Sequence, residues 1–541
     1  MILLVAINSV QNYLKNGTNS NEKQMKNKDW KTLDSMECFK ISNLCLFQKT
    51  TLSIQINEEG KIIYQKDGSI LYIEQYDSLF QAQNLEQLKF LRWHGQYNNK
   101  QQKIGKWQPQ WKGVNLEVGG LYCNQGMKTG NWIELFENFW DKSQVTFIGL
   151  YLNNKKQGKC GEGYYDYEGI SQGYWINLHR NFYDGRQIIY KGSYNNGTKQ
   201  GWWDISFHSY FDSRFKKIGG GYYNRDGKKN GKWIEVSENF WNGCQILEKG
   251  EYRNGLKIGI WESQLKEYID DNYKLIGLGC YNIDRKNGKW IEIHQKSMSF
   301  IHSKYFECKI INVGNYKEGL KIGNWISIDQ QTENIIGGGD YNQNGQKLGI
   351  WVEAEDYSSL SKITQKGRYV NGNKEGQWQI NLNNQKIGGG NYNDRGLKFG
   401  QWIEIYDKFW DYCKVLFVGN YKEGIKIGDW EVHFYQQDNN SLKIGKGTYN
   451  DLGMKTGQWT ELSETFWEKF QVIYEGQYSN GIKSGKWNAF FTGHLHNRNG
   501  IKIQKWMDLY ENYLEQPIYV GKYQDGIIMQ EFKQIKQMLY Y

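Results

Sequence analysis

The chain has 541 residues, of which 62 are glycine and only 2 are proline, and aromatic side chains make up 16% of it. A disordered chain is poor in aromatic residues, so this composition excludes disorder over the whole length. The net charge of +10 is modest for such a length and does not require a nucleic-acid partner.

The first 92 residues precede the regular part of the chain. Residues 1–40 are polar and irregular, and we expect a flexible N-terminal segment. In residues 41–92 short apolar runs flank the turn sequences 57–60 and 66–68, which predicts degenerate opening strands or a cap, with one short helix over 79–91. No charged start, cleavage site or run of about 18 apolar residues occurs, so we expect neither a signal peptide nor a membrane helix.

A repeated motif fills residues 93–490. The unit reads Gly-x-Tyr, three or four residues, and then Gly-x-Lys-x-Gly-x-Trp, and about 16 copies can be aligned by their tyrosines. The spacing from Tyr to Gly alternates, as in Tyr223–Gly227 and Tyr252–Gly255, so the true period is a pair of copies, about 57 residues long. Residues 491–541 depart from the motif and are predicted to form a degenerate repeat and a C-terminal cap.

Each copy has the pattern of a β-hairpin. Aromatic residues flank a stretch rich in Gly, Asn and Lys, and a short apolar run after each Trp predicts the next strand. Proline, which interrupts central strands, is almost absent. We therefore predict an all-β fold: an elongated antiparallel β-hairpin repeat array, either a twisted single sheet or a β-solenoid-like stack, with its Tyr and Trp side chains in rows.

The turn lysines are the main candidates for binding an anionic partner. If the copies stack in register, these side chains line one edge of the sheet and attract anionic lipid headgroups or an acidic protein surface. The alternative is that each lysine only solvates its turn and protects the edge. The lysines are Lys128, Lys199, Lys229, Lys257, Lys286, Lys321, Lys347, Lys374, Lys398, Lys426, Lys455 and Lys483.

Two further patterns occur once in a pair of copies. A glutamate follows Trp in six copies, and such recurrence indicates a structural charge that faces a neighbouring lysine, because an enzyme needs a single site. Four copies then add a Phe-Trp pair, which either packs under a longer loop or forms an exposed stripe for a partner. These pairs are Phe139–Trp140, Phe240–Trp241, Phe409–Trp410 and Phe466–Trp467.

The eight cysteines include no C-x-x-C pair. Cys244 and Cys413 occupy one position of the repeat, where other copies have Ser143 and Phe470, so we interpret this position as a packing site. Free thiols are typical of a reducing compartment, and we expect a cytoplasmic location.

The motif resembles that of MORN-type repeat proteins, specifically the divergent MORN-variant group. The stretches that carry the resemblance include Gly221-Tyr222-Tyr223 followed by Gly227-x-Lys229-x-Gly231-x-Trp233, and the resemblance spans roughly residues 93–526. It implies an elongated all-β scaffold of the kind often found at cytoskeletal or membrane-proximal structures.

No P-loop, nucleophile elbow or zinc-protease motif is present, so we expect no enzymatic activity, catalytic residue, metal, cofactor or small-molecule substrate. The primary hypothesis is a non-enzymatic scaffold that binds protein partners in the cytoplasm, associated with the cytoskeleton or a membrane. Two alternatives remain open: a peripheral binder of anionic membrane lipids through the turn lysines, and a carbohydrate-binding aromatic repeat module. The sequence leaves the partner and the oligomeric state open.

Overall fold

A computed structural model describes residues 31–531. Within that range it leaves out 42–46, 57–60, 76–84, 161–162, 211, 239, 267–271, 295–309, 358–361, 408, 410–411, 436–440, 464–465, 468–470, 492–520 and 525–526. The chain forms two compact units. The first comprises Met1–Met36, Thr51–Leu79 and Lys347–Tyr541, and the second comprises Glu37–Thr50 and Phe80–Gln346.

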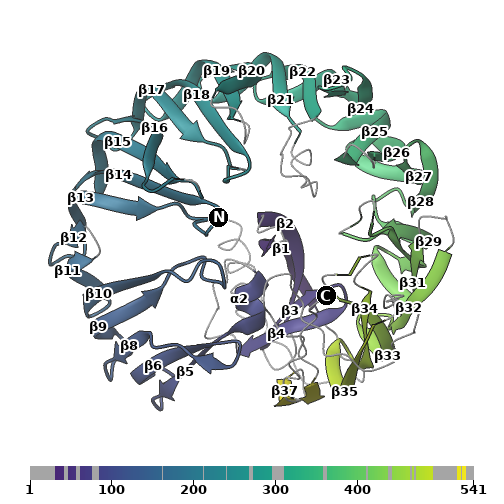
Figure 1. The fold of residues 1–541 in the computed structure, drawn as a ribbon, viewed down its shortest axis with the longest axis horizontal. Helices are drawn as coiled ribbons and strands as arrows, with labels where there is room; N and C mark the ends of the chain where they lie inside the picture. Colours follow the sequence, from purple (N-terminus) through teal and green to yellow (C-terminus); the bar gives the residue numbers. More distant parts are fainter. Residues whose placement is uncertain are drawn as a thin grey trace, which may run out of the picture. The chain divides into compact units, whose positions relative to one another are not determined.

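The second unit is an antiparallel sheet whose strands follow one another in sequence order (Figure 1). A short helix, α2 (Leu85–Phe90), precedes the sheet. The strands are β5 (Leu91–Tyr97), β6 (Lys103–Trp111), β7 (Val114–Asn115), β8 (Gly119–Tyr122), β9 (Lys128–Leu135), β10 (Thr146–Leu152), β11 (Lys155–Cys160), β12 (Gly163–Tyr165), β13 (Ser171–Leu178), β14 (Gln187–Asn195), β15 (Thr198–His208), β16 (Lys216–Tyr223), β17 (Lys229–Val236), β18 (Gln245–Arg253), β19 (Leu256–Lys266), β20 (Tyr273–Asn282), β21 (Arg285–Ile293), β22 (Ile310–Lys317), β23 (Leu320–Asp329) and β24 (Ile335–Tyr341).

The first unit continues the same architecture. Its array comprises β25 (Lys347–Tyr357), β26 (Lys362–Val370), β27 (Asn373–Leu382), β28 (Gln385–Tyr392), β29 (Lys398–Ile405), β30 (Val415–Lys422), β31 (Ile425–Tyr435), β32 (Ser441–Tyr449), β33 (Lys455–Leu462), β34 (Val472–Ser479), β35 (Ile482–Phe491), β36 (Gly521–Gln524) and β37 (Ile527–Glu531). The first unit also contains β3 (Lys61–Lys66) and β4 (Ser69–Gln75), whereas β1 (Lys31–Ile41) and β2 (Phe47–Ile56) are divided between the two units. The predicted all-β antiparallel hairpin array is therefore confirmed.

One row of aromatic rings runs along each unit and explains why the motif is repeated. Tyr and Trp alternate in this row and meet edge to face, with ring centroids between 4.9 Å (Tyr165–Trp175) and 6.2 Å (Trp325–Tyr341) apart. Such pairs add about 0.5–1.5 kcal/mol each beyond the area that they bury. The expected rows of aromatic side chains are confirmed, in the form of a single mixed row. We call the side of the sheet that carries it the tryptophan face.

The glycine of Gly-x-Tyr is required because the Trp ring of the adjacent strand lies directly on it. A Cβ at Gly367 would lie 2.2 Å from the Trp378 ring, far inside van der Waals contact. The glycine two residues before Trp has another role. At Gly376 a Cβ would meet nothing within 4 Å, but the backbone has a φ of +68°, which side chains other than glycine rarely adopt.

Elements formed by the opening residues contact the array in each unit. In the second unit, Gln87 of α2 donates hydrogen bonds to the carbonyl oxygens of Glu137 and Phe139, so the short helix covers the loop after β9. In the first unit, the turn between β3 and β4 joins the array, because Gly68 O accepts from Lys455 N at 2.9 Å.

Of the predicted helix over 79–91, Leu85–Phe90 are helical and Leu91 begins β5, while 79–84 lie outside the described residues. Strand β1 occupies the last part of the segment expected to be flexible, and residues 1–30 of that segment are likewise not described. Most of the predicted C-terminal cap, including 492–520 and 532–541, lies outside them as well. Across the part of the chain that the structure describes, no helix has the length and apolarity needed to cross a membrane.

Candidate functional sites: the lysine row and an aromatic surface

The twelve turn lysines, which we call the lysine row, lie on the tryptophan face. Each stands four residues before the Trp of its own copy, and its Nζ lies over that Trp ring. The distances from Nζ to the ring centroid run from 3.8 Å at Lys257 to 5.0 Å at Lys229. The stacked copies thus bring the row together as the sequence predicted, with every ammonium group held against an aromatic ring.

A glutamate is shared by two lysines in each regular pair of copies. Glu353 pairs with Lys347 of its own strand β25 and with Lys374 of β27 at 2.9 Å, and it accepts a hydrogen bond of 2.9 Å from the Tyr369 hydroxyl group. The same arrangement of one glutamate and two lysines recurs at Glu134, Glu235, Glu292, Glu404 and Glu461. The expectation that these glutamates face neighbouring lysines is confirmed.

Two of the shared carboxylates, Glu353 and Glu461, remain charged far below neutral pH. Burial alone would raise the pKa of Glu353, but Lys374 and Lys347 outweigh burial and lower it to about 2. The pKa of Glu461 is lowered to about 2 in the same way, against burial, by Lys455 and Lys483. Each carboxylate therefore neutralises part of the lysine charge. Within the described part of the chain, eleven of the twelve lysines have such a partner, the exception being Lys199.

One lysine of this arrangement was missed in the sequence. Lys156 belongs to a degenerate copy of the motif at Tyr151, and its Nζ contacts the Glu134 carboxylate at 2.9 Å. It follows its tyrosine by five residues, as Lys257 follows Tyr252, so this spacing could have identified Lys156 as a turn lysine. The copy was hard to recognise because Cys160 stands where the motif has Trp.

The phenylalanines of the Phe-Trp pairs lie inside the protein. Phe139, Phe240, Phe409 and Phe466 are all buried in core clusters, which corresponds to packing under the loop and not to an exposed stripe. Trp140 is buried and Trp241 and Trp467 are partly buried, while Trp410 lies outside the described residues. A fifth pair, Phe182–Tyr183, was missed because Tyr replaces Trp, although Phe182 follows its Trp by the usual seven residues.

The position shared by Cys244 and Cys413 links successive loops. Both cysteines are fully buried, which confirms the packing interpretation. Ser143 Oγ donates to Phe182 O at 2.6 Å, Arg186 donates to Ser237 O at 3.3 Å, and Cys413 Sγ contacts Phe466 O at 3.1 Å. At this position, 11 residues after the Trp of its copy, side chains of different chemistry therefore connect the loops of Ser143, Arg186 and Cys413 to the loop of the next pair of copies.

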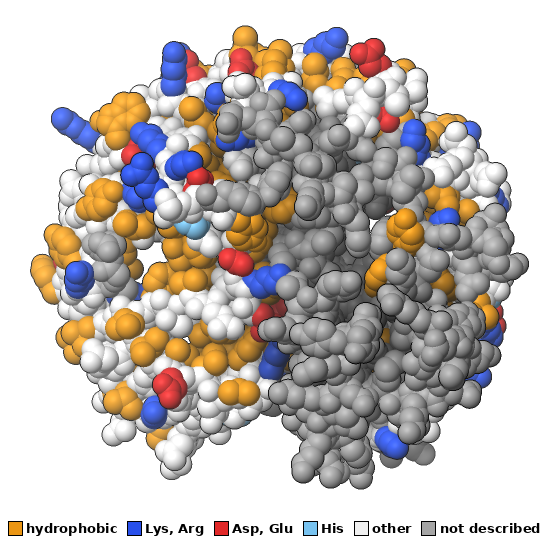
Figure 2. All heavy atoms as spheres, in the orientation of Figure 1, with side chains coloured by type: hydrophobic (Ala, Val, Ile, Leu, Met, Phe, Trp, Pro, Cys, Tyr) orange, Lys and Arg blue, Asp and Glu red, His pale blue; other side chains and the backbone are white. Residues whose placement is uncertain are grey.

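The opposite face of the second unit carries an exposed apolar area, which we call the aromatic surface. Alternation along each strand turns these side chains away from the buried Trp rings. Figure 2 shows hydrophobic side chains spread over the strands on the left of the view, where Figure 1 labels β9–β13. The members of the aromatic surface on β8–β16 are Leu121, Ile148, Leu150, Leu152, Tyr164, Tyr174, Trp202 and Tyr222.

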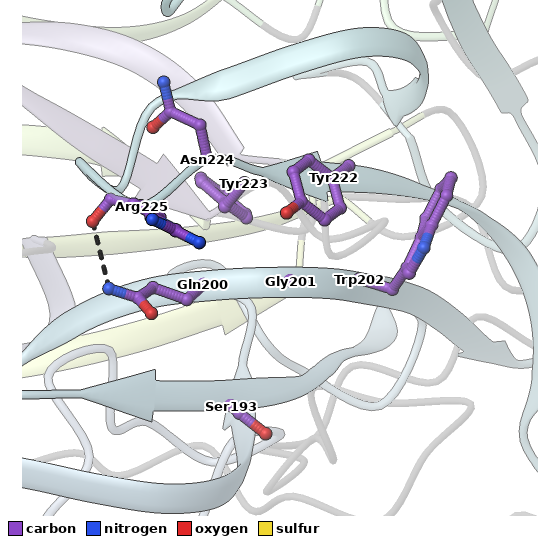
Figure 3. Close-up of a pocket in the computed structure, with 8 residues that line it drawn as sticks. All are labelled: Ser193, Gln200, Gly201, Trp202, Tyr222, Tyr223, Asn224 and Arg225. Carbon is purple, nitrogen blue, oxygen red and sulfur yellow. Dashed lines mark hydrogen bonds between the residues drawn. The ribbon is translucent and has the colours of Figure 1, made fainter.

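A shallow hollow lies at the end of the aromatic surface. Trp202 is 72% exposed and Tyr222 is 39% exposed, and their rings meet edge to face at 5.7 Å. Figure 3 shows both rings on neighbouring strands, and Gln200 donating a hydrogen bond of 3.0 Å to the carbonyl oxygen of Arg225. The hollow is lined by Ser193, Gln200, Gly201, Trp202, Tyr222, Tyr223, Asn224 and Arg225.

The aromatic surface is local, although the framework beneath it is repeated. The register pair Trp202–Tyr222 corresponds to Gln377–Asn391 and Gln401–Asn420 in the first unit, and all four of these polar residues are exposed. Leu348, Ile350 and Phe399 are apolar exceptions there. Since folding needs only the tryptophan face to be constant, the opposite face is free to differ from copy to copy.

A scan of protein-family models finds none that matches this chain, and a search of curated proteins finds no match. Among the residues that the structure describes, no group of three or more His, Cys, Asp or Glu side chains is placed to hold a metal ion.

Proposed function

We propose that the chain is a non-enzymatic, MORN-like repeat scaffold that binds another protein through the aromatic surface. The observation that carries this proposal is the contrast between a constant buried face and an opposite face that, over β8–β16, exposes large apolar and aromatic side chains among polar ones. Exposed apolar area is costly in water, and contiguous patches of it are typical of interaction sites. Tyr and Trp in particular supply large contact areas at protein interfaces.

The membrane alternative receives less support. A lysine row attracts anionic headgroups in proportion to its free charge, and here shared carboxylates already engage eleven of the twelve lysines. We therefore propose a protein as the direct ligand. Our proposal keeps the scaffold in the cytoplasm, at a cytoskeletal or membrane-associated structure.

The test is a pull-down in which the full-length chain is the bait, and it compares the proteins captured by the wild type and by two double variants. Trp202→Gln with Tyr222→Gln should lose the partner, and because Gln458 and Gln477 form the same register pair in the first unit, the fold should tolerate this change. Replacing Lys232 and Glu251 with glutamine alters the corresponding pair on β17 and β18 and should leave binding intact. Identical captured proteins for the wild type and both variants would contradict the proposal.

Carbohydrate binding is the second candidate, and the hollow in Figure 3 favours it. An exposed Trp ring beside Gln200, Ser193 and Arg225 offers a stacking surface together with hydrogen-bonding groups, the combination that a sugar ring needs. A glycan array separates the two candidates. Specific glycan hits that disappear with Trp202→Gln would support carbohydrate binding. An array without hits would exclude it and favour a protein as the ligand.

A further inference from the structure

The copy at Tyr165 has lost the shared glutamate and kept the second of its lysines. In the copy at Tyr165, Asn177 stands where the six regular copies have Glu, and Ser171 stands where they have the first lysine. The second lysine, Lys199, remains. No carboxylate among the described residues pairs with its Nζ, in contrast to the other eleven lysines of the row.

Lys199 is held in the same place as its counterparts. Its Nζ lies 4.3 Å from the Trp203 ring centroid, 5.7 Å from that of Tyr190 and 5.6 Å from that of Tyr223. The side chain is half-buried. Burial, followed by the charge of Lys229, lowers its pKa, as expected for an ammonium group without a counter-ion.

The surroundings of Lys199 also offer a hydrogen-bond donor. In five regular copies the tyrosine hydroxyl donates to the glutamate, as Tyr252 does to Glu235 at 2.9 Å. Here Asn177 Nδ2 donates to the Tyr194 hydroxyl oxygen at 2.9 Å, so the hydroxyl proton of Tyr194 is available to another acceptor. Asn is one methylene shorter than Glu, and Ser lacks the long lysine stem, so both changes remove side-chain volume at this point.

We propose that Lys199, Tyr194 and Asn177 form a binding site for a carboxylate group supplied from outside the chain. The ligand takes the place that Glu235, Glu292 and their equivalents fill internally, with Lys199 as its counter-charge and Tyr194 as a donor. The carboxylate comes either from a free small carboxylate ion or from an Asp or Glu side chain of a bound polypeptide.

This site is independent of the aromatic surface. Lys199 and Trp203 point to the tryptophan face, whereas Trp202, which directly precedes Trp203 on the same strand, points to the opposite face. A variant that removes one interaction therefore leaves the other in place, and the two proposals fail separately.

The test measures binding of a fluorescently labelled hexaglutamate peptide to the full chain by anisotropy, with sodium acetate as competitor and sodium chloride as the ionic-strength control. Lys199→Gln should weaken binding about tenfold, because a charge-assisted hydrogen bond is lost. Lys217→Gln removes the same charge from an exposed side chain and should change affinity less than about twofold.

A second variant keeps the proposal testable if Lys199→Gln fails to fold. Asn177→Glu combined with Ser171→Lys rebuilds the regular arrangement, so it should raise the thermal midpoint and abolish binding, because an internal carboxylate now occupies the site. Displacement by acetate would identify a site for any carboxylate, and binding of hexaglutamate without displacement by acetate would identify an acidic side chain as the ligand. Absence of binding to the wild type, or equal affinity of the wild type and the rebuilt variant, would overturn the proposal.

Discussion

Replacing Glu353 with glutamine tests whether a shared carboxylate holds two strands of the array together. Glutamine keeps the shape of the side chain but removes its charge, which leaves Lys347 and Lys374 facing one another on β25 and β27. The Glu353 side chain is only 16% exposed, so solvent screens its interactions weakly. We expect a large loss of stability for a change of one atom.

The magnitude follows from the pKa of Glu353, which is lowered from 4.5 to about 2. At about 1.4 kcal/mol per pKa unit, this shift contributes about 3 kcal/mol at pH 7. Because the folded-state pKa lies below the unfolded-state pKa, the contribution is fully present above pH 4.5 and is lost as the pH falls through 2. At pH 3 only about 1 kcal/mol of it remains.

The assay is urea unfolding at pH 7 and pH 3, followed by circular dichroism. Glu423→Gln serves as the matched control, because Glu423 pairs with Arg395 through side chains that are 51% and 65% exposed, and such pairs contribute at most about 1 kcal/mol. If Glu353→Gln costs no more than Glu423→Gln at pH 7, or costs the same at both pH values, the shared carboxylate is not a stabilising element and our reasoning is refuted.

Two further predictions concern packing and pH. Gly367→Ala should destabilise the chain far more than Gly376→Ala in urea unfolding, since only the first forces the buried Trp378 ring to move, whereas the second should cost about 1–2 kcal/mol of backbone strain; equal costs would contradict the packing argument. Burial, followed by the charges of Arg186 and Arg180, lowers the pKa of His179 from 6.5 to about 3, so stability should fall as the pH drops from 6.5 towards 3, and His179→Ser should remove that dependence. An unchanged pH profile of the serine variant would show that His179 is not the group responsible.

Local information was sufficient for the hairpin and its period. The alternation of Tyr and Trp around a glycine-rich turn predicts two paired strands, because every contact involved lies within about fifteen residues. The position shared by Cys244 and Cys413 was likewise recognisable as a packing site, since only steric demands allow Ser, Cys and Phe to interchange. Phe182 and Lys156 were missed because their copies keep the spacing of the motif but not its residues: Tyr183 replaces Trp after Phe182, and Cys160 replaces the Trp that follows Lys156.

The sequence by itself therefore determined the repeat, the hairpins and the buried aromatic row. Only the tertiary structure decided that Lys374 meets Glu353, that Lys199 has no carboxylate partner among the residues described, and that the exposed rings of Trp202 and Tyr222 meet on one face. The physical reason is that strand pairing sets which side chains of different copies meet, and a motif specifies each copy without specifying the register between them.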